Sequence, residues 1–479
     1  MMANPCSFTN SVGEDSQNGA EEMGEDVASV IIKESKDIKR PMHHGDIAVR
    51  LSRSALSCPG QACFWPKASS GLVLVPYTLS KDYSSADSEV IHSAIQEYTI
   101  LTCIRFVERK SETDYIQIHS VDGCWSYLGR IGGPQDLSLL NPGCVSKGVV
   151  QHELNHVLGF VHEHTRSDRD NYVDIYWANI PDVYKSNFEK SDPETNNLAV
   201  QYDYQSVMHY GRYSFTNVPG QPTIVPKPDA TVPIGQRYGL SSLDLLKINR
   251  LYQCDICSFL LYELSGTFYS GYTDSSVLNT LNCIWLIRIP ANKVILKFHT
   301  FTTSPSCSTD YMIVYDGASK SSPVLLNTTC GTGEPPPVVS TGNLMLVEFL
   351  GKEKTSFSAS YQTVVCGGTF TAVNGTVMSP GYPTKYFSST DCKWSIVGPP
   401  GYKVQLSFTS FALELSRNCI YDYLSILHGS HIDSSVSTKF CGSKKMPTLV
   451  TAGNWVLLEF HTDKSVQSTG FQIKYTSVV

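Results

Sequence analysis

The chain has 479 residues, of which 41% are hydrophobic and 17% charged, and its formal net charge is −7. This composition is typical of a globular protein of about three domains and excludes an intrinsically disordered chain. The mild charge and the lack of a basic cluster argue against nucleic-acid binding, and no apolar run approaches the roughly 20 residues that span a membrane.

Fifteen cysteines are spread along the chain, and only Cys254 and Cys257 form a CxxC pair. This distribution indicates disulfide bonds and an oxidising compartment. The opening segment MMANPCSFTNSVGEDSQNGAEEMGED is polar and acidic and shows no signal peptide. We give more weight to the cysteines and expect a secreted, extracellular protein. Asn327 and Asn374 each begin an Asn-x-Thr acceptor site for N-glycosylation.

The predicted elements change character along the chain. Residues 1–53 combine charge clusters with few apolar runs, which is typical of a poorly packed leader. Residues 54–256 mix a strand pattern, GLVLVPYTL, with helix patterns in SSADSEVIHSAIQEYTILT and SSLDLLKINRLYQC. Beyond residue 256, short alternating strands between Gly, Pro, Ser and Asn clusters indicate an all-β sandwich architecture.

The β-rich part of the chain is an internal repeat. Its first four cysteines are spaced 26, 24 and 23 residues apart, and its last four are spaced 26, 27 and 22 residues apart. The text repeats as well, because NCIWLIRIPANKVILKF matches DCKWSIVGPPGYKVQLSF. A unit of about 110 residues is too long for a solenoid repeat. We therefore predict two tandem domains, residues 257–365 and 366–479.

The segment VVQHELNHVLGFVHEHTRSDRD carries the strongest chemical signal. His152 and His156 are four residues apart and lie on one helix face, and Gly159 lets the chain turn so that His162 adds a third ligand. Three neutral imidazoles suit a catalytic zinc ion, which lowers the pKa of a water toward about 7. Glu153 is placed to take the proton of that water. The spacing H-E-x-x-H-x-x-G-x-x-H is the metzincin signature, and it favours this interpretation over histidines that serve packing or a structural zinc site.

The segment YQSVMHYGRYSF, farther along, adds two candidates. A methionine alone is normally a core residue, but metzincins place a methionine turn beneath the zinc ligands, and Met208 fits that place. Tyr210 is predicted to face the metal and to stabilise a developing oxyanion through its hydroxyl.

These residues resemble the astacin family of zinc metalloendopeptidases over about residues 54–254. The resemblance rests on HELNHVLGFVHEHTRSDRD, SVMHY, TCIRF, GCWSYLGRIGG and IGQRYGLSSLDLLKINRLYQC. It implies an α+β metzincin fold for residues 54–256, with zinc on the three histidines and Glu153 as general base. Tyr210 corresponds to the tyrosine switch of the family, and Met208 corresponds to its Met-turn. Glu163 corresponds to the residue that meets the mature N-terminus through water.

The leader resembles a propeptide. In the family an F-x-G-D segment silences the zymogen through its aspartate, and HHGD places Asp46 there, with His43 instead of Phe. The competing interpretations are an ordinary Gly-Asp turn and a direct contact of His43 or His44 with the metal. An activating, trypsin-like protease that cuts after Arg53 would produce the mature N-terminus.

The two repeats resemble CUB domains, all-β sandwiches with two disulfides each. Many CUB domains bind calcium through a Tyr, a Glu and two Asp. The second repeat keeps this set as Tyr386, Glu414, Asp422 and Asp463. The first repeat keeps Asp310 but has Lys352 in the place of the second Asp and no Glu. We therefore expect calcium in the second repeat only, the alternative being that these acids are solvated surface residues.

The two resemblances together imply seven disulfides, which are Cys58–Cys63, Cys103–Cys254, Cys124–Cys144, Cys257–Cys283, Cys307–Cys330, Cys366–Cys392 and Cys419–Cys441.

A protease domain followed directly by two CUB domains, with no EGF-like module between them, resembles the amphibian type of embryonic hatching enzyme. The resemblance implies glycoproteins of the egg's vitelline or fertilization envelope as substrate. One alternative is a tolloid-like protease that processes extracellular matrix or growth factors. Another is a CUB-mediated binding protein with a vestigial protease domain, which the complete set of ligands, base and tyrosine argues against.

Overall fold

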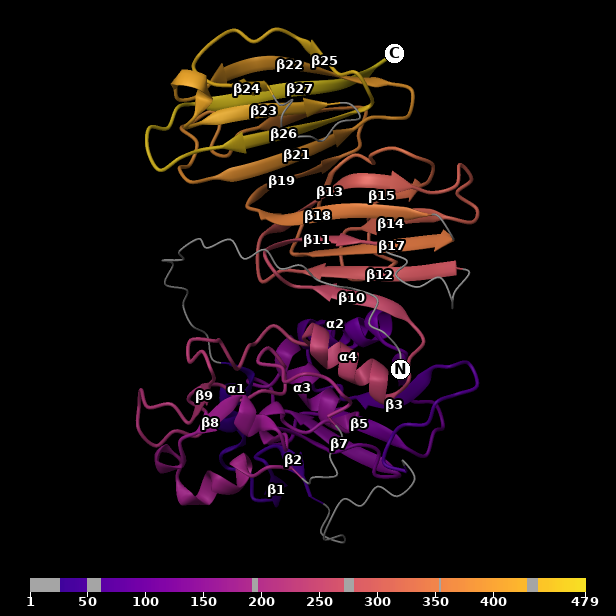
Figure 1. The fold of residues 1–479 in the computed structure, drawn as a ribbon, viewed down its shortest axis with the longest axis vertical. Coiled ribbons are helices and arrows are strands. Elements are labelled where there is room, and N and C mark those ends of the chain that lie inside the picture. Colours follow the sequence, from indigo (N-terminus) through magenta and orange to yellow (C-terminus); the bar gives the residue numbers. More distant parts are fainter. Residues whose placement is uncertain (1–25, 50–61, 192–196, 271–279, 353–354, 429–437) are drawn as a thin grey trace. The chain divides into compact units, whose positions relative to one another are not determined.

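The structure is a computed structural model that describes residues 26–49, 62–191, 197–270, 280–352, 355–428 and 438–479 (Figure 1). The chain forms two compact units, one that ends at Ile256 and one that begins at Cys257. The first unit mixes helices and strands and the second consists of two β-sandwiches, so the predicted fold class is confirmed. Among the described residues, no helix has both the length and the apolar character needed to cross a membrane.

A seven-stranded sheet organises the first unit, in the order β1-β2-β6-β7-β5-β3-β4. The strands are β1 (Met42–His43), β2 (Ile47–Ala48), β3 (Val73–Leu79), β4 (Ile104–Glu108), β5 (Tyr115–His119), β6 (Cys124–Tyr127) and β7 (Pro134–Leu139). Strands β4, β3, β5 and β7 are parallel, and β6 runs antiparallel to β7. The leader hairpin β1–β2 extends the sheet, because β2 pairs in parallel with β6.

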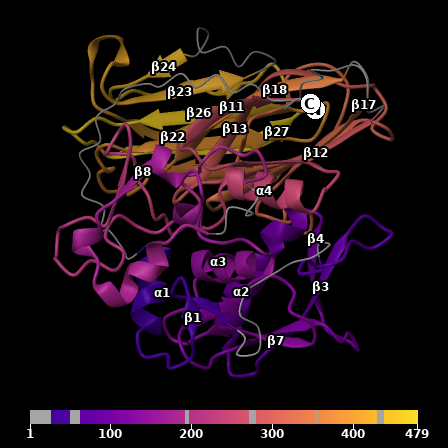
Figure 2. The same ribbon diagram turned by 60° about the horizontal axis from the view of Figure 1, so that its bottom comes forward.

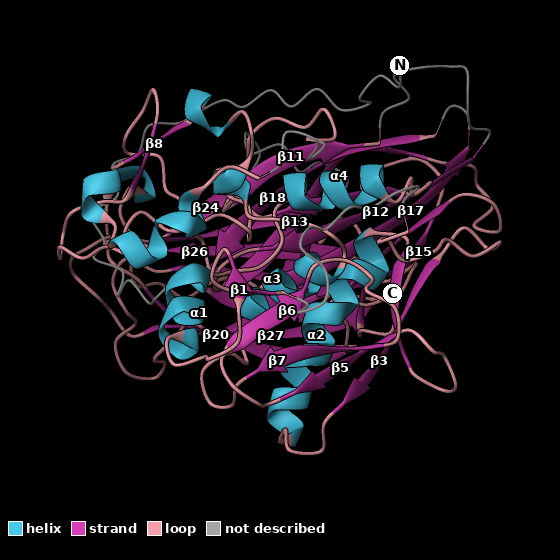
Figure 3. Ribbon diagram, turned by 90° about the horizontal axis from the view of Figure 1, so that it is seen from below, coloured by secondary structure: helices cyan, strands magenta, loops and turns pink. Residues whose placement is uncertain are grey.

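Four described α-helices belong to this unit, and the first three contact the sheet. They are α1 (Val27–Ser35), α2 (Ser85–Leu101), α3 (Lys147–Val157) and α4 (Ser242–Leu251). Helices α2 and α4 both begin with a capping box, which satisfies the free amides of their first turn. Helix α3 packs against α1 and α2 (Figure 2) and against β6 (Figure 3). Nearly all of α3 is buried, which accounts for its weak amphipathic pattern.

The other described elements of the first unit are short. These are the 3₁₀ helices Glu163–Thr165, Arg169–Asn171, Trp177–Asn179 and Asp182–Phe188, and the antiparallel pair β8 (Val173–Ile175) and β9 (Ile224–Pro226).

The prediction of a poorly packed leader is wrong for the described residues 26–49. Val27, Ala28 and Ile31 are buried on one face of α1, and Ile47 and Ala48 are buried in β2. Helix α1 contacts α3 and β6, while Ala28 joins the cluster of buried side chains that contains Tyr210. This amphipathic helix is only nine residues long, so the polar composition of residues 1–53 as a whole does not reveal it.

The second unit consists of two sandwiches of the same topology. In the first, the sheets have the orders β10-β12-β17-β14-β15 and β11-β18-β13-β16, and in the second β19-β21-β26-β23-β24 and β20-β27-β22-β25. The first sandwich comprises β10 (Cys257–Leu261), β11 (Ser265–Tyr269), β12 (Thr280–Arg288), β13 (Lys293–Thr302), β14 (Tyr311–Tyr315), β15 (Val324–Thr329), β16 (Val338–Val339), β17 (Leu344–Lys352) and β18 (Ser356–Val364). The second comprises β19 (Cys366–Phe370), β20 (Asn374–Met378), β21 (Asp391–Val397), β22 (Lys403–Ala412), the 3₁₀ turn Arg417–Cys419, β23 (Tyr423–His428), β24 (Thr438–Phe440), β25 (Leu449–Val450), β26 (Trp455–His461) and β27 (Gly470–Val478).

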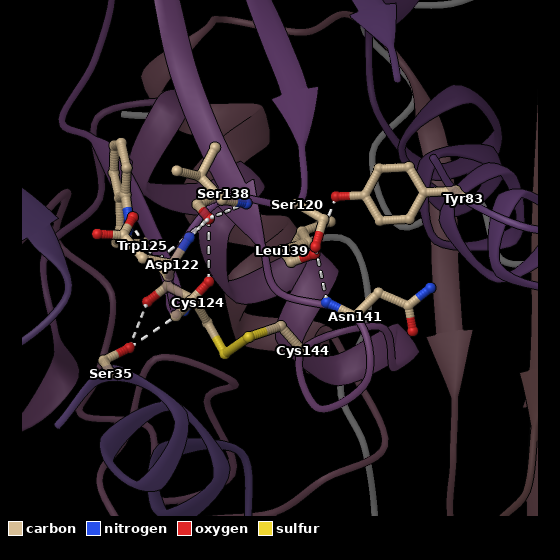
Figure 4. The surroundings of a disulfide bond; sticks show 12 residues. Ser35, Tyr83, Ser120, Asp122, Cys124, Trp125, Ser138, Leu139, Asn141 and Cys144 are labelled. Atoms are coloured by element: carbon tan, nitrogen blue, oxygen red, sulfur yellow. Dashed lines mark hydrogen bonds between the residues drawn. A yellow bond between two sulfur atoms is a disulfide. The ribbon is translucent and has the colours of Figure 1, made fainter. Parts of the chain in front are cut away.

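Six disulfides lie within the described residues, and they are six of the seven pairs expected. Cys58 of the seventh pair lies outside the described residues. Figure 4 shows how the leader is attached beside Cys124–Cys144: the Ser35 hydroxyl donates to the Cys124 carbonyl (3.2 Å) and accepts from the Cys124 amide (3.1 Å). The expected glycosylation sites Asn327 and Asn374 are exposed, in β15 and β20.

Candidate metal centre and active site

Three histidines converge in the interior of the first unit. His152 and His156 project from α3, and His162 follows the turn at Gly159, where φ is +98°. All three are at most 1% exposed, and the Nε2 atoms of His152 and His162 are 3.2 Å apart. A side chain at position 159 would also meet the Phe64 ring at 2.8 Å. The turn therefore requires glycine for its backbone conformation and for space.

Backbone carbonyls orient two of these rings. His152 Nδ1 donates to the Val207 carbonyl (2.8 Å), and His156 Nδ1 donates to the Phe160 carbonyl (2.7 Å). Each bond leaves the Nε2 lone pair directed at the centre. Burial lowers the pKa of His156 and lowers that of His162 to about 4, so both rings are neutral at physiological pH. Neutral imidazole is the form that binds a metal.

The carboxylate of Asp46 lies among the three Nε2 atoms. Asp46 Oδ2 is 3.1 Å from His152 and from His162, and Oδ1 is 3.5 Å from His156. Burial alone would raise the pKa of Asp46, but the histidines outweigh it and hold the pKa well below its usual value. His44 lies farther out, with its ring centroid 6.1 Å from that of His162.

The four side chains fit a zinc ion. Their ligand atoms lie within 4.8 Å of one another, and three nitrogens with one carboxylate oxygen form a donor set typical of zinc. Within the described part of the chain, His156 Nε2 and Asp46 Oδ1 are buried without a hydrogen-bond partner. Such orphaned atoms are rare in a folded protein and are explained by a metal that binds both.

Glu153 lies beside the histidines on α3 and is fully buried. Its Oε2 accepts a hydrogen bond from the Ser126 hydroxyl of β6 (3.0 Å), and its Oε1 is buried without a hydrogen-bond partner among the described residues. Burial, with Asp46 as the second cause, raises the pKa of Glu153 well above its usual value. One oxygen is thus held in place and the other is available to a reacting group.

Tyr210 lies next to His162 and is buried. Its hydroxyl donates to the carbonyl of His44, so the leader occupies it. Its ring stacks on His164 at 3.9 Å and is 4.7 Å from the ring of His162. Met208, two residues earlier, is 3% exposed, and its carbonyl accepts the amide of Glu163 (3.0 Å).

A model of the peptidase family Astacin matches residues 62–253, and the CUB domain model matches residues 257–361 and 366–475. The chain is 44% identical over 460 residues to embryonic protein UVS.2 of Xenopus laevis, which covers 95% of this chain and 88% of that protein. The chain belongs to the astacin family. It is also 47% identical over 340 residues to the astacin-like metalloendopeptidase of Gallus gallus, over 70% of this chain and 82% of that protein.

Among solved structures, the astacin chain is similar to high choriolytic enzyme 1, a hatching enzyme zinc-protease from Oryzias latipes. The identity is 51% and the TM-score 0.40, over 42% of this chain and 99% of that chain. The matches to the family model and to the curated relatives make the protein a metalloendopeptidase of a zinc-dependent family, and it carries two CUB domains.

Asp244 of α4 is a supporting residue of this astacin site that sequence reasoning missed. Its carboxylate accepts hydrogen bonds from the Ser206 hydroxyl (2.6 Å) and the Val207 amide (2.9 Å). The Val207 carbonyl in turn accepts the His152 ring. Ser241 and Asp244 have the S-x-x-D spacing of a capping box, in which Asp244 does take part. Nothing in the spacing indicates that the same carboxylate also holds the Met-turn.

Glu163 lies in a buried group of charges next to His162. Its Oε2 pairs with Lys247 Nζ, and its Oε1 accepts from Arg166 (3.2 Å) and from the Asp203 amide (2.9 Å). The expected partner, an N-terminus at residue 54, lies outside the described residues. The contact of Glu163 with a mature N-terminus stays a prediction.

The second CUB domain brings together the expected acidic residues. Glu414, Asp422 and Asp463 lie close enough for one cation. The Tyr386 hydroxyl donates to Asp422 Oδ2 (2.5 Å), and the Asp463 amide donates to Asp422 Oδ1 (2.8 Å). Desolvation raises the pKa of Glu414 most, and the neighbouring Asp422 and Asp463 raise it further through repulsion, which a cation relieves.

Proposed function

We propose that this astacin is a secreted hatching-type endopeptidase that digests egg-envelope glycoproteins and is made as a latent zymogen. The similarity to an embryonic protein over 95% of the chain supports the embryonic role. Two CUB domains directly after the protease, with no module between them, support the same class rather than a tolloid-like one. The disulfides support an extracellular site of action.

The position of Asp46 carries the proposal of latency. Its carboxylate takes the place that a zinc-bound water needs, at 3.1–3.5 Å from all three Nε2 atoms. Strand β2 covers the edge of β6, where an extended substrate would add as a strand. Helix α1 bridges α3 and the cluster around Tyr210, across the site. The leader would therefore block three features at once: the position of the zinc-bound water, the strand edge that binds substrate and the hydroxyl of Tyr210.

Removal of the leader frees three groups for catalysis. His152, His156 and His162 would hold a zinc ion, whose charge would polarise the scissile carbonyl and activate a water. Glu153 accepts the proton of the attacking water through Oε1 and delivers it to the leaving amine. The Tyr210 hydroxyl, released from His44, donates a hydrogen bond to the developing oxyanion.

We further propose that the second CUB domain binds calcium through Glu414, Asp422 and Asp463, with Tyr386 orienting Asp422. Three carboxylates on one small surface repel one another, and a hard divalent cation is the ligand that suits them. The first CUB domain is proposed to bind none. There Asp310 stands alone, and Lys352 occupies the position of Asp463.

The test compares the full chain with Glu153→Gln, Asp46→Ala and, as leader control, Asp37→Ala, whose side chain is exposed. After activation by trypsin, the wild-type chain is expected to hold about one zinc and to dissolve isolated egg envelopes. Glu153→Gln should keep zinc and lose about 10²–10⁴-fold in cleavage rate, the contribution of a general base. Asp46→Ala should cleave casein before activation, whereas Asp37→Ala should stay latent.

Two results would contradict parts of the proposal. Cleavage of casein with an intact envelope would leave a peptidase but remove the egg envelope as substrate. A latent Asp46→Ala chain would show that the carboxylate does not hold the enzyme inactive.

A further inference from the structure

An exposed apolar patch surrounds the acidic cluster of the second CUB domain. It consists of Phe387 (63% exposed), Leu415 (80%), Ile420 (62%), Tyr421 (46%) and Val466 (62%), and these are called the apolar patch below. Phe387 follows Tyr386, Leu415 follows Glu414, and Tyr421 precedes Asp422, so the patch alternates with the cluster. Contiguous exposed apolar side chains of this size mark interaction sites.

Hydrogen bonds tie the loops that carry the patch to one end of the sandwich. The Thr462 hydroxyl donates to the Phe387 carbonyl (2.9 Å), and the Tyr386 amide donates to the Ser468 carbonyl (3.0 Å). The Gly442 amide donates to the Glu414 carbonyl (3.2 Å). The disulfide Cys419–Cys441 joins the same two loops again. The five apolar side chains therefore stand on loops that are held together.

The same loops are basic apart from the cluster itself. They carry five exposed basic side chains, which are Lys385, Arg417, Lys444, Lys445 and Lys464. The acidic residues at this end are the three carboxylates of the cluster and the exposed Asp391 at the start of β21, which leaves a charge of +1. A bound calcium ion would raise this charge to +3. The end of the domain is thus apolar and cationic, and it complements an acidic partner.

The first CUB domain offers an internal comparison. Counted from the matching cysteines, Ser308 and Thr309 occupy the positions of Ile420 and Tyr421. The patch is thus a property of the second domain and does not follow from the fold.

We propose that the apolar patch and its basic side chains form a docking surface for an acidic protein of the egg envelope. Such a partner would present carboxylates around an apolar cleft. An anionic membrane has the same chemistry, but anionic lipids face the cytoplasm, whereas the disulfides place this chain outside the cell. This inference rests on the proposed function, because it gives the protease a hold on its own substrate matrix.

The experiment measures sedimentation of the full chain with isolated envelopes, in a Glu153→Gln background that prevents digestion. The double variant Leu415→Ser, Ile420→Ser gives the patch the polarity of the first domain. It is expected to weaken binding at least tenfold, since the apolar area that these two side chains bury against a partner stabilises the complex. The matched control is Val373→Ser, Val450→Ser, which removes side chains of 55% and 50% exposure outside these loops. The control should bind like the parent.

A second variant tests charge. Lys444→Glu, Lys445→Glu is expected to weaken binding most at low salt, since screening reduces the contribution of exposed charges. Equal binding by the patch variant and its parent would overturn the proposal, as would equal loss in the Val373, Val450 control. Patch-dependent binding to phosphatidylserine vesicles, without binding to envelopes, would overturn the choice of a protein partner.

Failure of the docking surface and failure of the hatching role can be told apart in chains with intact Glu153. If the patch variant digests envelopes as fast as the wild type, only docking is overturned. If the wild type cleaves casein but leaves envelopes intact, the hatching role is overturned.

Discussion

The carboxylate of Asp244 offers the sharpest test of how the zinc ligands are positioned. Asp244 is 3% exposed and accepts hydrogen bonds from Ser206, Val207 and the Ser241 amide at 2.6–3.0 Å. In Asp244→Asn, one carboxylate oxygen becomes an NH₂ group, which cannot accept a hydrogen bond from the hydroxyl or amide groups that face it. Each buried donor left without an acceptor costs about 1–3 kcal/mol. The Val207 carbonyl, which holds His152, is then no longer fixed.

Loss of such outer contacts typically lowers metal affinity about 10–100-fold, which corresponds to about 1.4–2.8 kcal/mol. We expect this fall in the zinc affinity of Asp244→Asn, measured by competition with a chelator of known affinity. The matched control is Asp87→Asn, because Asp87 occupies the same capping-box position in α2 without a link to the Met-turn.

The control should lose some thermal stability and keep its zinc affinity. Unchanged zinc affinity in Asp244→Asn would refute the reasoning. An equal loss in Asp87→Asn would assign the effect to helix capping in general.

Buried or strained positions give three further expected outcomes. Burial, with the neighbouring acid of α4 as second cause, raises the pKa of Asp203 to about 7, so its contribution to stability falls as the pH rises from about 4 to 7. Asp203→Asn should lose less stability than the wild type over that range in urea unfolding. Gly235→Ala should lower the melting temperature of the protease clearly more than Gly220→Ala: both have φ near +80°, but only at position 235 does a Cβ meet backbone at 2.4 Å. Calcium should raise the melting temperature of the wild type and of Asp310→Asn but not of Asp422→Asn, and a rise in Asp422→Asn would contradict the calcium site.

The local parts of the active site follow from the spacing of the motif, whereas its long-range parts were predictable only through the family resemblance. His152, His156 and His162 meet because helix geometry and one glycine bring them together within a short segment. The disulfide pairing was predictable only through the family resemblance, since cysteine spacing alone allows many pairings. The contact of Asp46 with His152 joins residues 106 apart, and no periodicity encodes such a contact.

Helix α1 shows a different limit of sequence reasoning. Only three of its side chains are buried, Val27, Ala28 and Ile31, and they follow a long polar segment. Short amphipathic stretches of this kind are stable only when a neighbouring surface covers them. The surface that covers α1 belongs to residues more than 100 positions away, such as Gly148 and Tyr210.

The three separate attachments of the leader bear on how fast the proposed zymogen would become active. The helix is anchored through Ser35 at Cys124, Arg40 lies 3.7 Å above the Trp125 ring, and Asp46 is held at the histidines. A single cut between residues 49 and 62 leaves all of these contacts intact. If the leader keeps the enzyme latent as proposed, the severed leader would act as a tight inhibitor, whose departure is a slow step of its own and whose return depends on concentration. Dilution, or a second cut within the leader, would therefore set the onset of activity as much as the first cleavage does.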